Sequence, residues 1–452
     1  MNRSMQPMLT EGPVSGHLRE MAMPMVWGLL ATMSFNAVDT FFVAMLGHEP
    51  LAAMSFTFPV VMVLTSIAIG LGAGTSSTVA RAIGSDNHHL AQRMATDAMS
   101  LTTIIALVVC GIGWFTIEPL FKLLGAEDQL VPLIHDYMWI WYFSAPCLMV
   151  PMVGLASLRA MGLARIQGTL MIAAAALNLV LDPILIFGLF GFPRLELEGA
   201  ALATLITRAL SLVVVLWVLH KRLGMLVNPF ARFDEVWASW RAILHVGVPA
   251  MVNNVIIPMA SGVVVYLVAS YGTVAVAGLG IAMRIEPIAL IVFYALSGVV
   301  GPFCGQNLGA QKFARLDETL RVVTRFCLGF GVVLALVLWL AGELLIRLFS
   351  DQQEVIDVAR SYLLIVPFSY GAYGLVMSVN AAFNGIGQPM PGVAISFMRV
   401  LGFYLPLALM MQWLWGLTGL FVATASCNFL VGLVAWLWLR QRFHTTATAA
   451  TT

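Results

Sequence analysis

Two carboxylates lie inside long apolar stretches of this sequence, where a charge is costly. Asp39 comes about twenty residues into the first apolar run, and Asp182 interrupts the segment LNLVLDPILIFG. Even lenient insertion scales give about 2.5–3.5 kcal/mol for a carboxylate at the centre of a membrane helix. Burial favours the protonated form of such an acid, and water or a cation releases the proton. We therefore expect Asp39 and Asp182 to bind and release an ion.

The neighbours of Asp182 are the oxygen and amide groups that an ion site requires. Asn178 lies one helical turn earlier, so its amide can donate to the carboxylate. Pro183 cannot donate a backbone hydrogen bond and leaves a carbonyl of the preceding turn free. Thr204 is a candidate further oxygen. These groups suit a proton, or a Na⁺ held by Asp39, Asn178, Asp182 and Thr204, and the sequence leaves that choice open.

Other charges in apolar segments have a structural alternative. Arg208 is a candidate partner for either acid, in which case the carboxylate is kept neutral or paired for packing. In the second half, Arg284 and Glu286 lie in GIAMRIEPIAL and Arg399 lies in FMRVLGFYLP. For these residues we favour an ion pair of Glu286 with Arg399 or Arg284 over a second ion-coupling site.

The composition is that of a membrane protein with many spans. Of the 452 residues, 60% are hydrophobic and 10% are charged, whereas soluble domains carry about 25% charged residues. The mean hydropathy is +0.92. About twelve runs reach the length that spans a bilayer, which predicts an all-α membrane protein. The predicted spans are 18–46, 51–80, 94–116, 131–155, 166–190, 199–220, 242–269, 274–304, 319–345, 357–380, 391–413 and 417–439.

Lysines and arginines orient these spans. Of the 23, fifteen fall on the side of the N-terminus, three on the other side, and five inside spans. The positive-inside rule then predicts that this multi-pass protein has both termini in the cytoplasm. The polar segment 221–241 predicts a cytoplasmic linker, with an amphipathic interfacial helix over 229–241. It separates an N-terminal lobe (1–220) from a C-terminal lobe (242–443), and residues 444–452 are predicted to be disordered.

The two halves resemble each other in sequence. Several residues recur 225 positions later, and further matches follow at offsets of 223 and 220. Each half has about six spans, so the second half enters the membrane in the same orientation as the first. We therefore expect two six-helix lobes related by a pseudo-two-fold axis along the membrane normal. The matches are Pro24 with Pro249, Gly47 with Gly272, Ala52 with Ala277, Gly84 with Gly309, Gly162 with Gly385, Pro183 with Pro406, Gly199 with Gly419, Ala203 with Ala423 and Thr204 with Thr424.

Other function classes lack their motifs. The chain has no phosphate-binding GxxxxGK[ST] loop, no zinc-protease HExxH and no GxSxG. We therefore predict that it is not an enzyme and needs no cofactor beyond its counter-ion. The net charge of +1 gives no reason to expect nucleic-acid binding. We expect a monomer in contact with lipid.

Several segments resemble the multidrug and toxic compound extrusion (MATE) family of secondary transporters. They are Pro24 with NAVDTFFVAMLG (36–47), GLGAGTSSTVARAIGSDN (70–87), ALSGVVGPFCGQNLGAQK (295–312), LRAMGLARIQG (158–168), FNGIGQPMPG (383–392) and NLVLDP (178–183). The resemblance covers nearly the whole chain. It implies two lobes in a V and the export of amphipathic, often cationic drugs in exchange for H⁺ or Na⁺.

The acids narrow the resemblance to one branch. NorM-like members carry acids in the seventh and tenth helices, whereas here the seventh, GVPAMVNNVIIPMASGVVVYL, has none. The pair Asp39 and Asp182 is similar to the DinF-like branch, which implies that this acid pair of the N-terminal lobe couples ions to transport. Pro24 is then either a hinge of the first helix or a proline tolerated near its start. The remaining alternative is a flippase or exporter of a lipid-like substrate. Candidates for the substrate cavity are Met33, Phe35, Asn36 and Met171.

Overall fold

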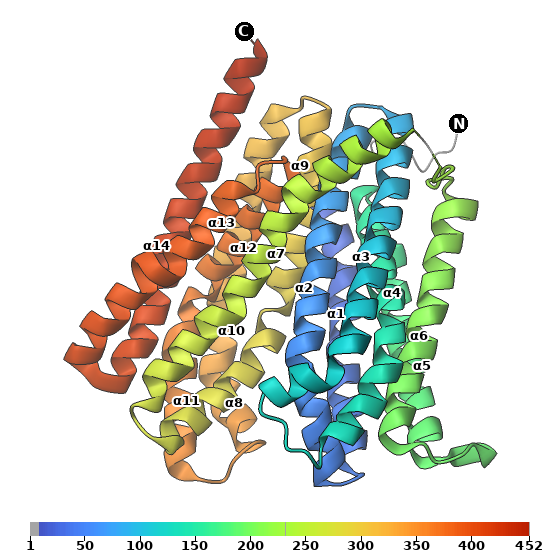
Figure 1. The fold of residues 1–452 in the computed structure, drawn as a ribbon. Helices are drawn as coiled ribbons and strands as arrows, with labels where there is room; N and C mark the ends of the chain where they lie inside the picture. The colour runs from blue at the N-terminus through green and yellow to red at the C-terminus, as the bar shows by residue number, and fades with distance from the viewer. Residues whose placement is uncertain (1–8, 231, 452) are drawn as a thin grey trace. The chain divides into compact units, whose positions relative to one another are not determined.

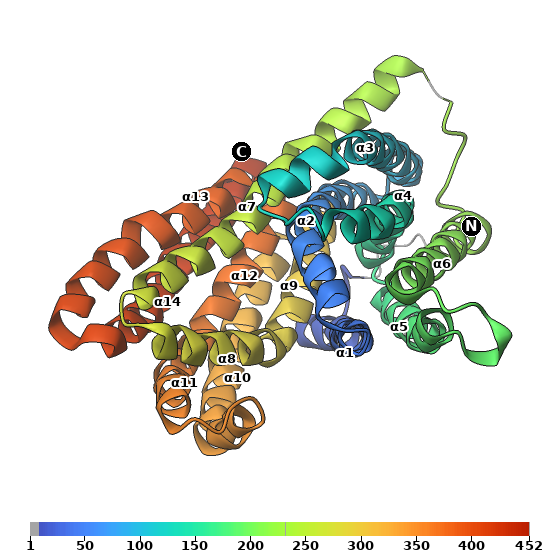
Figure 2. The same cartoon turned by 60° about the horizontal axis from the view of Figure 1, so that its bottom comes forward.

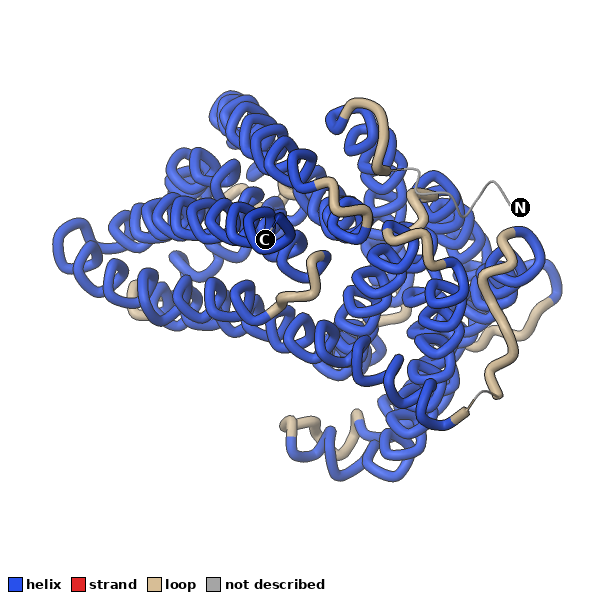
Figure 3. The backbone as a smooth tube through the Cα atoms, turned by 90° about the horizontal axis from the view of Figure 1, so that it is seen from above, coloured by secondary structure: helices blue, strands red, loops and turns tan. Residues whose placement is uncertain are grey.

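The computed structural model describes residues 9–230 and 232–451, and these form helices joined by short loops (Figure 3). Eleven helical runs in the described part are long and apolar enough to cross a membrane. The last run reverses at Gly416, whose φ of 58° and ψ of −135° are open to glycine alone, and this reversal divides it into two spans. The predicted all-α membrane architecture of about twelve spans is thereby confirmed.

The first seven α-helices are long, and Figure 1 labels them. Their bounds are α1 (Val14–Ala44), α2 (His48–Gly84), α3 (His88–Leu123), α4 (Val131–Ala160), α5 (Ala164–Phe187), α6 (Glu196–Trp217) with a π-helical extension over Val218–Arg222, and α7 (Phe233–Ala269). Helix α7 runs without a break through the predicted interfacial helix and the predicted seventh span. The expected separate helix over 229–241 is therefore wrong, because no helix-ending residue stands between the two segments.

The chain after α7 is more interrupted. It comprises α8 (Thr273–Ala289), α9 (Ile291–Gly309), α10 (Phe313–Arg347), α11 (Gln353–Ile365), α12 (Tyr370–Gly385), α13 (Met390–Phe397), a π-helical stretch over Met398–Tyr404, and α14 (Leu405–Thr451). The predicted span 274–304 is divided at Leu290, shortly after Pro287. The predicted disorder of 444–452 is wrong as far as Thr451, because α14 continues through those residues.

Helix boundaries confirm the internal repeat. Helix α1 ends at Ala44 and α7 ends at Ala269, and α2 begins and ends 225 residues before α8 begins and α9 ends. The loops agree too: Asp86 and Gln311, again 225 apart, have φ of 58° and 57°. One predicted match needs correction, since Gly162 (φ 79°) corresponds to Gly387 (φ 75°) and not to Gly385, which ends a helix.

The contacts divide the chain into two compact units, each treated separately below. Unit 1 contains residues 23–251, and unit 2 contains residues 9–22 with the chain from Val252 onward. These limits differ from the lobes drawn from the sequence, because the first part of α7 packs in unit 1 and the first part of α1 packs in unit 2. Gly224, Val227 and Asn228, which lie within the predicted linker 221–241, are hydrogen-bonded to α3 of unit 1.

Helix α4 is the centre of unit 1. It packs against α2, α3 and α6, as the view in Figure 2 shows nearly along the helix axes. Its residues Tyr137, Met138, Trp141 and Tyr142 are all buried in one hydrophobic cluster. Helix α5 packs on α6 and thereby joins the same unit. The aromatic face of α4 is thus the rigid surface on which polar residues of unit 1 are placed.

Hydrogen bonds with charged and polar side chains hold the polar segments that precede α1 and α7. In unit 2, Arg315 donates to the carbonyls of Leu9 and Gly12 at 3.0 and 2.7 Å, and Lys312 donates to the carbonyl of Thr10 at 2.9 Å. In unit 1, the buried ion pair of Arg93 and Asp97 on α3 lies against the segment before α7. Three hydrogen bonds join α3 to the segment before α7: Arg93 Nη1 to Asn228 O at 2.9 Å, Gln92 Nε2 to Gly224 O at 2.8 Å and Val227 N to Thr96 Oγ1 at 3.0 Å. A fourth joins α7 itself to α3, from Trp240 Nε1 to Asp97 O at 3.1 Å.

Candidate functional site

Helix α5 supplies the first acid of the candidate site. Asp182 is fully buried, and Asn178 Nδ2 donates to its Oδ1 at 2.7 Å. This hydrogen bond, predicted from the four-residue spacing, is confirmed. Asp182 Oδ2 is buried and has no hydrogen-bond partner among the described residues. A buried carboxylate oxygen without a donor is costly when charged, so the site favours a proton or a cation at this atom.

Helix α1 supplies the second acid. Asp39 is 8% exposed, and its Oδ1 also lacks a hydrogen-bond partner in the described part of the chain. Asp39 and Asp182 interact electrostatically, and the buried Tyr137 of α4 interacts with both. The structure therefore brings together the two carboxylates that the sequence separates by more than a hundred residues. Two like charges in one buried site cannot both be ionised without cost, which couples the proton binding of the two acids.

Helices α1 and α5 approach each other through small residues. Gly168 lies against the Pro24 backbone, and a Cβ at residue 168 would overlap the Pro24 carbonyl. One turn along α1, Gly28 faces the Met171 side chain of α5. Pro24 is inside α1 and half-buried. The predicted hinge residue is therefore in contact with the helix that carries Asp182, although its role as a hinge stays a prediction.

Arg208 of α6 is held by α4 and not by an acid. Its Nη1 donates to the buried Ser144 Oγ at 2.8 Å, and its guanidinium carbon lies 5.0 Å from the centre of the Trp141 ring. It interacts electrostatically with Asp39 but makes no ion pair with Asp39 or Asp182 among the described residues. The direct ion pair of Arg208 with an acid, which the sequence offered as an alternative, is therefore not present among the described residues.

The remaining predicted residues are spread over different environments. Thr204 is buried on α6, Met33, Phe35 and Met171 are half-buried, and Asn36 is exposed. The sequence analysis missed Tyr137, Trp141 and Ser144. Tyr137 and Trp141 are one turn apart in HDYMWIWYF, and this pair of amphipathic aromatics on one helix face was the available signal.

The charges of unit 2 form a separate polar cluster. Tyr362 donates to Glu286 Oε2 at 2.6 Å, and the Arg399 guanidinium lies 4.0 Å from the centre of the Tyr373 ring. Arg399 interacts electrostatically with Glu286, but no ion pair joins them in the described residues, and Arg284 is exposed. The expected ion pair is therefore replaced by a tyrosine hydrogen bond and a cation–π contact.

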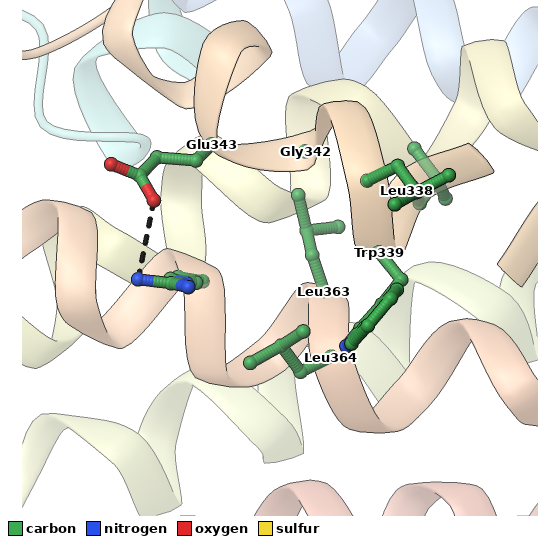
Figure 4. Close-up of a pocket in the computed structure, with 8 residues that line it drawn as sticks. Leu338, Trp339, Gly342, Glu343, Leu363 and Leu364 are labelled. Atoms are coloured by element: carbon green, nitrogen blue, oxygen red, sulfur yellow. Dashed lines mark ion pairs between the residues drawn. The ribbon is translucent and has the colours of Figure 1, made fainter. Parts of the chain in front are cut away.

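The cavity drawn in Figure 4 belongs to unit 2, where it lies between α10 and α11, and neither acid of the candidate site is among its lining residues. It has a volume of about 80 Å³ and is lined by Trp339, Leu363 and Leu364 among others. The Arg360 Nη1 to Glu343 Oε2 ion pair at 3.2 Å crosses its edge. Both charged side chains are about half-exposed, so the pair contributes little stability.

A family comparison agrees with the repeat. The MatE family model matches residues 24–184 and again residues 249–410, which together make more than half of the chain. The chain belongs to the MATE family. Both matches begin at the repeated prolines, Pro24 and Pro249, and the first match includes Asp39, Asn178 and Asp182. This MATE chain is therefore a multi-pass membrane transporter and not an enzyme.

Characterised relatives extend the comparison. The MATE chain is 39% identical to a protein of Shewanella oneidensis named FAD transporter, over 96% of each chain. It is 26% identical to the probable multidrug resistance protein YoeA of Bacillus subtilis, over 81% of this chain and 80% of YoeA. Among solved structures, the Vibrio cholerae MATE transporter VcmN in its bent form is 31% identical, covers 96% of this chain and 97% of its own, and has a TM-score of 0.91.

Proposed function

We propose that this MATE transporter exports amphipathic, often cationic small molecules in exchange for H⁺, with Asp39 and Asp182 as the proton-binding groups. The observation that carries the proposal is the pair of buried carboxylates, each with one oxygen that lacks a hydrogen-bond donor. The protein would act in a bacterial-type inner membrane with both termini in the cytoplasm. The similarity to relatives named as multidrug proteins, such as the probable multidrug resistance protein YoeA, supports this cargo class.

Proton exchange follows from the chemistry of the site. When both acids are protonated, the buried oxygens carry no charge and a cationic cargo gains nothing by binding near them. When the acids lose protons, the negative charge attracts the cation, so proton and cargo compete for the same groups. A Na⁺ at Asp39, Asn178, Asp182 and Thr204 would use the same oxygens, and the experiment below separates the two ions.

The test is cargo-driven proton movement in proteoliposomes that contain the wild type, Asp39→Asn or Asp182→Asn. Ethidium is the cargo, with and without Na⁺ in the buffer. We expect each substitution to abolish proton movement, and we expect Na⁺ to have no effect on the wild type. Asp234→Asn, an exposed acid at the start of α7, is the matched control and keeps wild-type flux. Full flux in both Asn variants would contradict the proposal, and flux that requires Na⁺ would replace H⁺ by Na⁺.

Flavin export is a second candidate function. It is favoured by the 39% identity to the FAD transporter of Shewanella oneidensis, which is higher than the identity to the multidrug relatives. A flavin has a flat aromatic ring system, and its dinucleotide carries negative phosphates. Proteoliposomes loaded with FAD would release it through the wild-type protein when a proton gradient is imposed. Release of ethidium without release of FAD would reject this candidate and retain the first.

A further inference from the structure

Arg208 is a third charge in the neighbourhood of the two acids. It lies inside the membrane-spanning helix α6 and is half-buried, where an unpaired guanidinium is costly. Its bonds are with uncharged groups of α4: the hydroxyl of Ser144 and the ring of Trp141. Both groups are almost completely buried, so this arrangement is built into the core of unit 1.

The guanidinium has unused hydrogen-bonding capacity toward the acids. A guanidinium has five N–H donors, and one of them is used by Ser144. Asp39 Oδ1 has no donor among the residues that the structure describes, although Asp39 and Arg208 interact electrostatically. The titratable groups that face Arg208 across the adjoining helices are Asp39 of α1, with Tyr137 and Cys147 of α4. Asp182 of α5 interacts with Asp39 and Tyr137.

We propose that Arg208 is a tethered counter-ion that sets the charge of the ion site and thereby its cargo preference. The inference rests on the proposed function. Arg208 is a positioning residue: it rests on Ser144 and Trp141 while Asp39 is protonated, and it stabilises Asp39 when that acid loses its proton. It also limits the time that an ionised Asp39 remains without any cation, because the side chain cannot diffuse away.

The charge of the cluster follows from this assignment. With Arg208 present, Asp39 and Asp182 give a net charge of −1 without protons, zero with one proton and +1 with two. Without Arg208, each of these states is one unit more negative. A cationic cargo is therefore favoured in the deprotonated state and repelled in the doubly protonated state, whereas an anionic cargo has the opposite preference.

The first test is the pH dependence of ethidium efflux for the wild type, Arg208→Gln and Arg208→Lys. A nearby cation favours the ionised carboxylate, so its removal makes Asp39 hold its proton to higher pH. Because Arg208 makes no direct bond to Asp39, we expect Arg208→Gln to move the half-maximal pH upward by about one unit, the low end for a close opposite charge. Arg208→Lys keeps the charge, so we expect its half-maximal pH to stay near that of the wild type even if its rate falls.

Ser144→Ala keeps the fold and the charge while it removes the hydrogen bond that holds Arg208 on α4. The freed guanidinium has Asp39 as its neighbouring acid, so we expect the half-maximal pH to move downward. This variant keeps the test decisive if Arg208→Gln cannot be purified. An unchanged pH profile in Arg208→Gln, or in Ser144→Ala, would overturn the inference. So would an equal shift in Arg208→Gln and Arg208→Lys.

The second test uses the charge of the cargo. One unit charge at roughly 12 Å in an effective dielectric of about 20 changes binding about tenfold. We expect Arg208→Gln to lower the KM for ethidium by about tenfold and to raise the KM for FAD where FAD is carried. A change of both values in the same direction would refute the role in cargo preference.

Asp39→Asn separates this inference from the proposed function. Wild-type transport by Asp39→Asn would reject the proposed function itself. Loss of transport in Asp39→Asn with a wild-type pH profile in Arg208→Gln would reject only the role of Arg208.

Discussion

Replacing Gly168 by alanine should force helices α1 and α5 apart. An ideal Cβ at residue 168 would lie 2.7 Å from the Pro24 carbonyl carbon and 3.0 Å from Pro24 Cβ, and it would overlap the carbonyl oxygen. Non-bonded carbon atoms pack best about 3.5–4.0 Å apart, so the helices must separate by roughly 0.5–1 Å. The obstacle is backbone, which cannot rotate away as a flexible side chain can.

The energetic cost is the difference between two opposing effects. Overpacking a close contact costs about 1–3 kcal/mol. Alanine is favoured over glycine within a helix by roughly 0.5–1 kcal/mol, which offsets part of that cost. We therefore expect a net loss of about 1–2 kcal/mol in stability. We expect the ethidium efflux rate to fall even where the protein stays folded. Helix α1 carries Asp39 and α5 carries Asp182, so the separation of the two helices sets how strongly the two acids interact.

The measurements are the thermal unfolding midpoint in detergent and ethidium efflux in proteoliposomes. Gly111→Ala is the matched control in unit 1, because a Cβ at residue 111 of α3 meets nothing within 4 Å. We expect this control to keep wild-type efflux. Gly28→Ala should be intermediate, since a Cβ at residue 28 would meet Met171 Cβ and Sδ at 3.1 Å, a less severe overlap than that of residue 168 with the Pro24 backbone. Equal midpoints and equal efflux for Gly168→Ala and Gly111→Ala would refute the idea that close approach of α1 and α5 maintains the site.

Two further predictions concern charges outside the proton site. Asp97→Asn leaves buried Arg93 without its carboxylate, so we expect a loss of about 3–5 kcal/mol in unfolding free energy; a denaturation midpoint equal to that of the wild type would contradict this. Glu286→Gln keeps an acceptor for the Tyr362 hydroxyl, so we expect cargo-driven proton flux to persist in proteoliposomes. Loss of that flux would show instead that unit 2 contains a second coupling site.

The fold was largely predictable because a membrane span can be identified from the length and apolar composition of its sequence. Twelve apolar runs and a repeat at an offset of 225 predict twelve spans in two related halves. The described residues form eleven membrane-length runs, the last of them divided at Gly416, and their helix boundaries recur at the same offset. The interruptions were harder to place. The division at Leu290 and the continuity of α7 through 229–241 depend on how the helices pack, since neither has an unambiguous local signal. Hydrophobicity alone does not show whether a polar segment is bound to a neighbouring helix. The segment before α7, which is hydrogen-bonded to Arg93 of α3, is an example.

The site was predictable where its signal is local. Asn178 and Asp182 share a helix face, and their hydrogen bond follows from a spacing of four residues. The contacts of Arg208 could not be predicted in the same way, because Ser144 and Trp141 are more than sixty residues away in sequence. A single sequence identifies the costly buried charge but not the partner that tertiary packing selects for it.

Helix α1 joins proton binding to the boundary between the units. Its residues up to Ala22 pack in unit 2, and the rest of the helix carries Asp39 in unit 1. Pro24 lies within two residues of that division, and Pro249 lies within two residues of the division in α7, at Met251. A proline removes one backbone hydrogen bond of its helix, so bending costs least there. The predicted hinge residue Pro24 thus stands close to the point at which α1 passes from one unit to the other, and its role as a hinge stays a prediction.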